Sequence, residues 1–182
     1  MLHFREDRVT QAAARLLRLR GGRMSYLKLI KLLYFADRKA LAELGRPISF
    51  DLFVSMPHGP VLSRTYDLIA GEPDPTQPSY WHDHISPPDA EFSVQLLREP
   101  PNDQLSPAEE AILDAVFERY GRMSRWQVRD ESHALPEYRD PEGSSEPISI
   151  RDVLVHQGFS EEDAAAVVDA LTAEAVADQV AG

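Results

Sequence analysis

Apolar positions spaced three or four residues apart open the chain. Over residues 5–20 they form one stripe, while Arg8, Arg15 and Arg18 fall on the other side. This period of about 3.6 residues predicts an amphipathic helix. The pair Gly21-Gly22 interrupts the pattern and predicts its end.

A second helix is predicted over residues 26–44. Ser25 stands at its start as a suitable N-cap, and Gly45 stands at its end as a C-terminal stop. The middle of this segment, residues 27–36, is apolar on nearly every face. A helix that is apolar all round is usually buried all round, so we expect it at the centre of the core.

The next segment changes to a period of two. Apolar and polar side chains alternate loosely over residues 48–56, which predicts a short strand. A turn is predicted at residues 58–60. Because a proline at the first helical position loses no hydrogen bond, we expect Pro60 to open a third helix that runs to about Ala70.

Proline interrupts any helical pattern in the middle of the chain. Residues 72–104 hold seven of the fourteen prolines. Within them, residues 80–85 and 91–97 predict a hairpin around the turn at 87–90. We expect this hairpin and the strand at 48–56 to form one small antiparallel sheet.

The last third of the chain is helical again, and its helix starts are marked by serines. The predicted N-caps are Ser106, Ser124 and Ser160. The first two open capping boxes with Glu109 and Gln127. The last helix is predicted to reach about Ala177, after a short helix over 150–156. In total we expect about six or seven helices.

Length and composition favour one domain of α+β class, predominantly α-helical, with a helical core and a small antiparallel sheet or hairpin. The 182 residues match the usual size of one domain, so residues 1–182 are expected to form a single unit. The chain has no cysteine, which excludes disulfides and thiol nucleophiles and is compatible with a cytoplasmic protein. No segment is apolar enough for a signal peptide or a membrane span.

Charge is distributed unevenly. Residues 1–70 hold 12 Lys and Arg against 6 Asp and Glu, whereas residues 71–182 hold 7 against 24, which gives +6 and −17 and a total of −11. This acidity argues against general nucleic-acid binding. Two interpretations stay open: the two parts attract each other within the monomer or across a dimer, or an acidic surface meets a basic partner.

Candidate chemistry is sparse. On a strand, His82 and His84 would share a face and could reach one metal ion, but no third ligand is indicated, so surface histidines are the alternative. Asp130 and His133 could together form a catalytic base, although no nucleophile accompanies them. The alternative is that His133 bonds the carbonyl groups at the end of its helix. Phosphate-binding glycine motifs are absent. We therefore expect no enzyme, no metal and no cofactor.

Aromatic side chains divide into two groups. Tyr34 and Phe35 lie in the apolar helix and are expected in the core. Trp126 and Tyr138 lie near helix–loop boundaries, where a half-buried ring either closes the core or anchors a partner.

A set of motif residues recurs in a characteristic order along the chain: Lys31, Leu32, Leu33, Tyr34, Phe35, His58, Gly59, Pro60, Val61, Tyr66, Trp126 and His133. Their order and spacing resemble the Panacea domain, also called the SocA-like or phage-associated family. The resemblance spans about residues 8–170. The family typically has a Thr-His pair followed by a tryptophan; here the pair is Ser132-His133, and Tyr138 is the only ring near the tryptophan's place.

The resemblance implies an antitoxin of a toxin–antitoxin module, which neutralises a cognate toxin protein by direct binding. One member of the family is also an adaptor that delivers its toxin to a Clp-type protease. The acidic C-terminal half and the proline-rich hairpin would then offer surface to a basic toxin. The alternatives are an interaction module of phage or mobile-element origin without a toxin, and a metal-dependent hydrolase that uses His82 and His84. The oligomeric state is left open.

Overall fold

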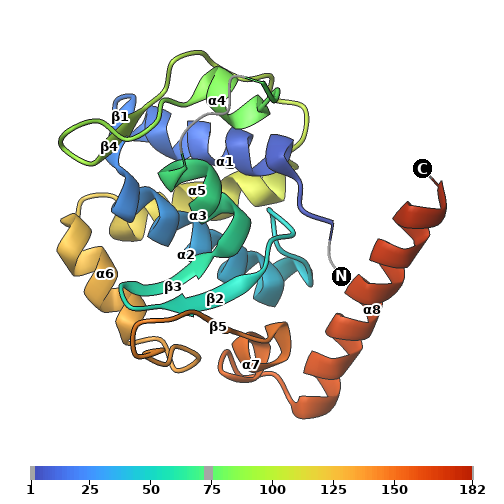
Figure 1. Ribbon diagram of the computed structural model, residues 1–182. Helices are drawn as coiled ribbons and strands as arrows, with labels where there is room; N and C mark the ends of the chain where they lie inside the picture. Colours follow the sequence, from blue (N-terminus) through green and yellow to red (C-terminus); the bar gives the residue numbers. More distant parts are fainter. Residues whose placement is uncertain (1–2, 72–75, 182) are drawn as a thin grey trace.

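The computed structural model describes residues 3–71 and 76–181 (Figure 1). The helices of this part are α1 (Glu6–Leu19), α2 (Tyr26–Leu44), α3 (Ser63–Ala70), α4 (Tyr80–His84), α5 (Pro107–Tyr120), α6 (Arg125–His133), α7 (Ile150–Val155) and α8 (Glu161–Ala181). The strands are β1 (Arg23–Ser25), β2 (Phe53–Met56), β3 (Gly59–Leu62), β4 (Ser93–Gln95) and β5 (Glu146–Pro147). This composition confirms the α+β class with helices predominant.

Helix α2 forms the centre of the core, as its all-round apolarity predicts. It contacts α1, α3, α5, α6 and α7, and also β1 and β3. Leu29, Ile30 and Leu32 have no exposed surface. Its bounds agree with the prediction, and at its end Gly45 adopts the left-handed conformation, with its N–H donating to the carbonyl of Leu41 at 3.1 Å. The predicted capping role of Ser25 is wrong: its side chain makes no cap hydrogen bond, and the N–H of Tyr26 donates to the carbonyl of Phe92 at 2.9 Å.

The strands form two small antiparallel sheets instead of the single sheet expected from residues 48–56 and 80–97. In one sheet the order is β3-β2-β5, and Val54 of β2 lies opposite both Val61 and Pro147. In the other, β1 pairs with β4, with Met24 opposite Val94. Strand β1, which directly precedes α2, was not predicted.

Pro60 does not open a helix. It lies in β3 opposite Ser55, and α3 begins only at Ser63. The first N–H groups of α3 are satisfied by the carboxylate of Asp51, which accepts from the backbone of Arg64 at 3.1 Å and of Thr65 at 2.8 Å. A side chain outside the helix therefore serves as its cap. Pro60 is not needed at the first helical position and lies in strand β3 instead.

The segment predicted as a strand over residues 80–85 is the short helix α4. The carboxylate of Glu6 on α1 accepts from Ser79 Oγ at 2.8 Å and from the N–H of Trp81 at 2.9 Å, and Trp81 is fully buried. Tertiary contacts with α1 therefore override the local pattern. Of the expected hairpin, β4 forms part of the predicted second strand. The two segments also pair locally: Ile85 bridges Leu96, and the N–H of Leu97 donates to the carbonyl of His84 at 2.7 Å.

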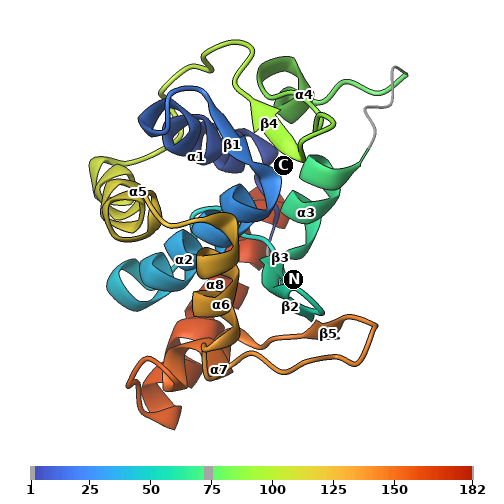
Figure 2. The same ribbon diagram turned by 90° about the vertical axis from the view of Figure 1, so that its left-hand side faces the viewer.

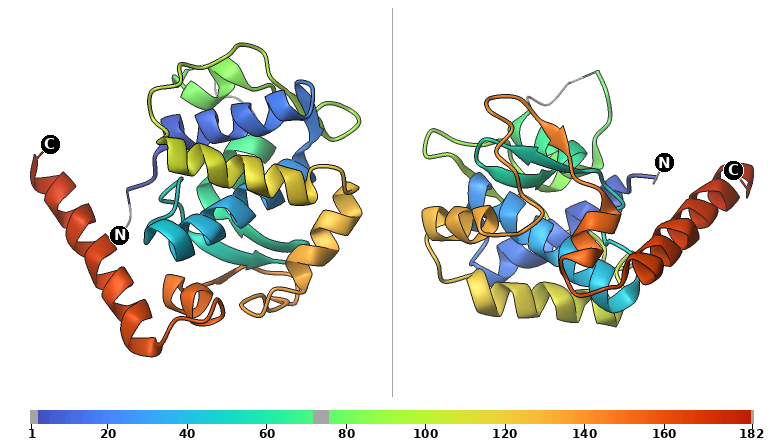
Figure 3. Two further views of the ribbon diagram at one scale, coloured as in Figure 1. Left: turned by 180° about the vertical axis from the view of Figure 1, so that it is seen from behind. Right: turned by 90° about the horizontal axis from the view of Figure 1, so that it is seen from below.

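The C-terminal helices α5, α6 and α8 begin after the serines that were predicted as their N-caps. Both capping boxes are present, and Ser160 Oγ accepts from the N–H of Asp163 at 3.0 Å. Helix α8 extends to Ala181, beyond the expected Ala177. It packs on α7, and its far end stands apart from the other helices in both views of Figure 3.

Ion pairs join the basic first third of the chain to the acidic remainder. They are Arg8–Glu109, Arg15–Glu110, Arg15–Asp114, Arg18–Glu99, Arg23–Asp89, Arg23–Glu91, Arg38–Glu137 and Arg46–Glu109. The interpretation in which the two parts attract each other within the monomer is thereby confirmed. Of the acidic hairpin residues, Asp89 and Glu91 pair with Arg23 but stay solvent-exposed, and α8 has an acidic exposed surface at Glu162, Asp169 and Glu174.

Candidate functional site

Motif residues from three elements converge at the turn between β2 and β3. Gly59 in this turn has a φ of +96°, and a Cβ there would lie 2.6 Å from Ser132 Oγ, 2.8 Å from His133 Cδ2 and 3.0 Å from Lys31 Nζ. Both the backbone conformation and the close approach of three side chains therefore require glycine. The turn thus brings the middle of α2 and the end of α6 together.

Lys31 is the most unusual residue of this cluster. Its side chain has 0% exposure, and its Nζ donates to the carbonyl of Pro60 at 2.8 Å. No carboxylate in the described part of the chain pairs with it. Because burial disfavours the charged form, the pKa of Lys31 is lowered to about 7. At neutral pH its charged and neutral forms are therefore both populated.

His133 ends α6 beside this lysine. Its ring stacks on Tyr138 with centroids 4.8 Å apart, and its buried Nε2 has no hydrogen-bond partner in the part of the chain that the structure describes. Burial, followed by the positive charge of Lys31, lowers the pKa of His133. Asp130, considered as its partner in a base, instead pairs with Arg129 at 2.6 Å. The Asp130–His133 pair that was considered as a possible base is therefore not formed.

Tyr138 supplies a ring contact near the place where the family typically has a tryptophan. Besides stacking on His133, it donates its hydroxyl proton to the carbonyl of Met56 at 3.1 Å. Tyr138 thus fastens the segment after α6 to the β2–β3 hairpin.

Glu137 extends the same network to the next turn of α2. Its buried carboxylate accepts from Arg38 Nε at 2.6 Å and lies 3.3 Å from the hydroxyl of Tyr34. Burial, followed by the negative charge of Glu137, raises the pKa of Tyr34. Nothing in the sequence marks Glu137 as buried, since it lies in a polar stretch after a proline.

The remaining motif residues support the fold. Leu32, Leu33 and Val61 are buried in the core. Phe35 stacks on Tyr120 with centroids 4.4 Å apart. Tyr66 is partly buried against the core cluster. The prediction that Tyr34 and Phe35 belong to the core is confirmed.

Asp37 is a buried carboxyl that the sequence does not reveal. It accepts from the backbone N–H groups of Ile48 at 2.9 Å and Ser49 at 3.1 Å and so fixes the chain after α2. Burial raises its pKa to about 7, and these hydrogen bonds oppose the shift.

Two motif residues face outward. His58 and Trp126 line a surface hollow of about 250 Å³ together with Tyr26 and Phe92. Trp126 is 49% exposed, so it does not close the core, and the alternative of an outward-facing anchor agrees with its position.

His82 and His84 do not form a metal site. They lie in a helix, where positions two apart point about 200° from each other, and not on a strand. His82 Nδ1 contacts Ser79 Oγ at 3.1 Å, and His84 Nδ1 contacts the carbonyl of Arg98 at 3.0 Å. The described residues contain no group of three side chains able to hold a metal ion.

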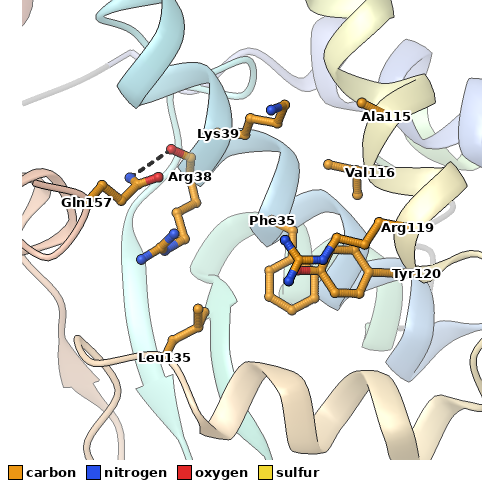
Figure 4. Close-up of a pocket in the computed structure, with 9 residues that line it drawn as sticks. All are labelled: Phe35, Arg38, Lys39, Ala115, Val116, Arg119, Tyr120, Leu135 and Gln157. Carbon is orange, nitrogen blue, oxygen red and sulfur yellow. Dashed lines mark hydrogen bonds between the residues drawn. The ribbon is translucent and has the colours of Figure 1, made fainter.

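Another hollow, of about 240 Å³, lies between α2, α5 and the segment after α6 (Figure 4). The stacked rings of Phe35 and Tyr120 form part of its wall, and Gln157 Nε2 donates to the carbonyl of Arg38 at 3.0 Å. Its cations are engaged within the chain: Lys39 pairs with Glu43 at 2.5 Å, for example. Its lining contains no histidine, serine or carboxylate that would support catalysis.

Within the described residues, no helix is long and apolar enough to cross a membrane.

Comparison with known proteins matches this chain to a family model. Neither the curated proteins nor the solved structures contain a match to this chain. Residues 29–138, more than half of the chain, match the model of the family described as "Antitoxin SocA-like, Panacea domain". This range includes the whole Lys31–Gly59–His133 cluster, and the chain therefore belongs to the SocA-like Panacea family.

Proposed function

We propose that this protein is an antitoxin that neutralises a cognate toxin protein by binding it directly. The observation that carries the proposal is the match to the antitoxin SocA-like family over residues 29–138. The proposed place of action is the cytoplasm, where a toxin made in the same cell would be met.

We call the group of Lys31, Gly59 and His133 the motif cluster. Its geometry supports a binding role without catalysis. Lys31 has a lowered pKa, which is also a property of catalytic lysines, but its Nζ points at the backbone of Pro60. Lys31 and His133 line none of the hollows described above. Lys31 is fully buried and His133 is partly buried, and their role in the proposal is to hold the β2–β3 turn on α2 and α6.

Delivery of the bound toxin to a Clp-type protease is a second step of the proposal. It predicts that the toxin's half-life shortens when the antitoxin is present and that this effect disappears in a strain without the protease. A toxin half-life that does not depend on the protease would remove this step and leave neutralisation by binding intact.

The deciding experiment expresses the adjacent gene from an inducible promoter, alone and together with this protein. The proposal predicts growth arrest alone and recovery on co-expression. A version of the antitoxin gene with an early stop codon is the control, because it separates the effect of the protein from that of its RNA. If the neighbour is harmless alone, or arrests growth equally in both strains, the antitoxin assignment fails and an interaction module without a toxin is the better account.

A further inference from the structure

Two hollows meet at the start of α2. The first, of about 250 Å³, is walled by the rings of Tyr26, Phe92 and Trp126. The second, of about 470 Å³, is lined by basic side chains, among them Arg20 and Lys28. Both include Ser25 and Arg125, so they form one surface with an apolar half and a cationic half. We call this surface the Trp126 groove. In Figure 2, α6 lies below β1 on this side of the molecule.

The apolar half exposes a ring that the backbone holds outward. Phe92 is 58% exposed and has a φ of +58°, a conformation that side chains with a Cβ rarely adopt. Its N–H donates to the carbonyl of Asp89 at 3.0 Å, and its carbonyl accepts from the N–H of Tyr26 at 2.9 Å. The turn is therefore fixed at both sides of the ring. Strained residues of this kind cluster at functional and ligand-binding positions.

Trp126 also lines the apolar half, and two guanidinium groups contact its ring. The Cζ atoms of Arg125 and Arg129 lie 4.9 and 5.2 Å from the centre of its ring. These contacts hold the indole in place at the surface, which lowers the entropy that a partner would have to remove on binding. Tryptophan and arginine are also the residue types most enriched at the centres of protein interfaces.

The cationic half has positive charge that the chain itself does not neutralise. Within the described residues, no acidic side chain pairs with Arg20 or Arg125. Lys28 is buried and donates to the carbonyls of Gly121 at 2.5 Å and Met123 at 2.7 Å, which leaves one N–H of its ammonium group unused. Burial, followed by the charge of Arg20, lowers the pKa of Lys28.

Acidic groups near the groove are already paired. Asp89 and Glu91 each lie 2.6 Å from a nitrogen of Arg23, and Asp130 pairs with Arg129. The hydroxyl oxygen of Ser25, on the border between the two halves, is buried and has no hydrogen-bond partner among the described residues. A buried polar atom without a partner marks a place where a bound group could supply one.

We propose that the Trp126 groove docks a segment of the toxin in which a large apolar side chain stands next to carboxylates. The apolar side chain would fill the hollow between Phe92 and Trp126, and the carboxylates would meet Arg20 and Arg125. This inference rests on the proposed antitoxin function and adds the surface and the chemistry of the partner. It differs from the expectation that an acidic surface binds a basic toxin.

Nucleic acid fits the groove less well than an acidic protein segment. The protein has a net charge of −11, so a phosphate backbone that runs beyond the groove would meet a repulsive surface. The acidic helix α8 is the competing surface for a protein partner. Its side chains at Glu162, Asp169 and Glu174 are exposed. Of these, Glu174 borders a hollow of about 130 Å³ that it shares with Arg8 and Arg46, so basic side chains of this chain already lie beside it.

The test measures binding of the purified neighbour-encoded protein to variants of this chain. Trp126→Ala and the double change Arg20→Glu/Arg125→Glu are each expected to weaken binding at least about tenfold, as loss of a central interface side chain does. Leu97→Ala, at a side chain that is 59% exposed, and Arg98→Glu are the matched controls and should stay within about twofold of wild type. Melting temperatures of all variants establish that each is folded.

Three outcomes would overturn the inference. Wild-type affinity in both groove variants would refute it, most clearly if Asp169→Asn/Glu174→Gln on α8 abolishes binding. A single-stranded RNA oligonucleotide that binds wild type and not Trp126→Ala, while toxin binding is unaffected, would assign the groove to nucleic acid. A wild-type protein that neither binds nor neutralises the neighbour would refute the antitoxin function itself, which distinguishes that failure from failure of the groove alone.

Discussion

Replacing Lys31 by methionine tests whether water is excluded from the centre of the motif cluster. The side chain has 0% exposure, and its Nζ has one hydrogen bond, to the carbonyl of Pro60 at 2.8 Å. Burial lowers its pKa from 10.5 to about 7. Between these two values the unfolded chain binds a proton that the folded chain does not. The free energy of unfolding therefore rises with pH in this window, by at most about 1.4 kcal/mol per pH unit.

The size of the effect follows from the two pKa values. From pH 7.5 to 9.5 the folded protein is mostly neutral at Lys31 and the unfolded chain is mostly charged. The wild type should therefore gain about 2.5 kcal/mol of stability relative to Lys31→Met over this range. Methionine also leaves the carbonyl of Pro60 without its donor, but that loss does not depend on pH. The range lies above the titration of His133, whose pKa is lowered.

Urea unfolding followed by circular dichroism at pH 7.5, 8.5 and 9.5 measures this difference. Lys39→Met is the matched control, because Lys39 is partly exposed and pairs with Glu43 at 2.5 Å. Its stability relative to wild type should be flat over the same range. A flat difference for Lys31→Met as well would show that Lys31 keeps an ordinary pKa and that water reaches the cluster.

Three further predictions concern the fold and its chemistry. Leu29→Ala and Leu33→Ala should each lower the free energy of unfolding by about 2–5 kcal/mol, and melting within a degree or two of wild type would show that α2 is not the core. Gly59→Ala should destabilise more than Gly143→Ala in chemical denaturation, because both have φ near +97° but only Gly59 has side chains close by; equal losses would refute the close approach. Elemental analysis of untagged protein should find well under one equivalent of metal, and a stoichiometric metal lost in His82→Ala would contradict the binding role.

Local signals in the sequence were sufficient to predict the position of most helices. The apolar run over residues 27–36 located the core helix, and the serine caps at Ser106 and Ser124 located two helix starts. These features depend on hydrogen bonds and periodicity within a few residues, so they can be read without knowledge of the fold.

Features that depend on distant residues could not be read in this way. Asp51 caps α3 from outside the helix, and Glu6 holds α4 in a segment whose local pattern predicts a strand. The motif cluster is of the same kind, because Lys31 and His133 lie about a hundred positions apart. The sequence resemblance named both residues, but only the left-handed turn at Gly59 shows that they meet.

The surface properties were the least predictable. The summed charge of −17 over residues 71–182 indicated an acidic face, whereas the structure pairs part of that charge with arginines of the first third. What remains unpaired at the start of α2 is positive. A charge count cannot distinguish a paired carboxylate from a free one, since pairing is decided by tertiary contacts.

The central claim is that this protein neutralises a toxin by binding it, and titration of the two purified proteins tests it most directly. The proteins are this chain and the product of the adjacent gene, with association and dissociation rates measured from about 50 to 500 mM salt. The account predicts saturable binding at a fixed stoichiometry and an association rate that falls with salt, because charges around the groove steer the encounter. Recovery of growth on co-expression without measurable binding of the purified pair would contradict it.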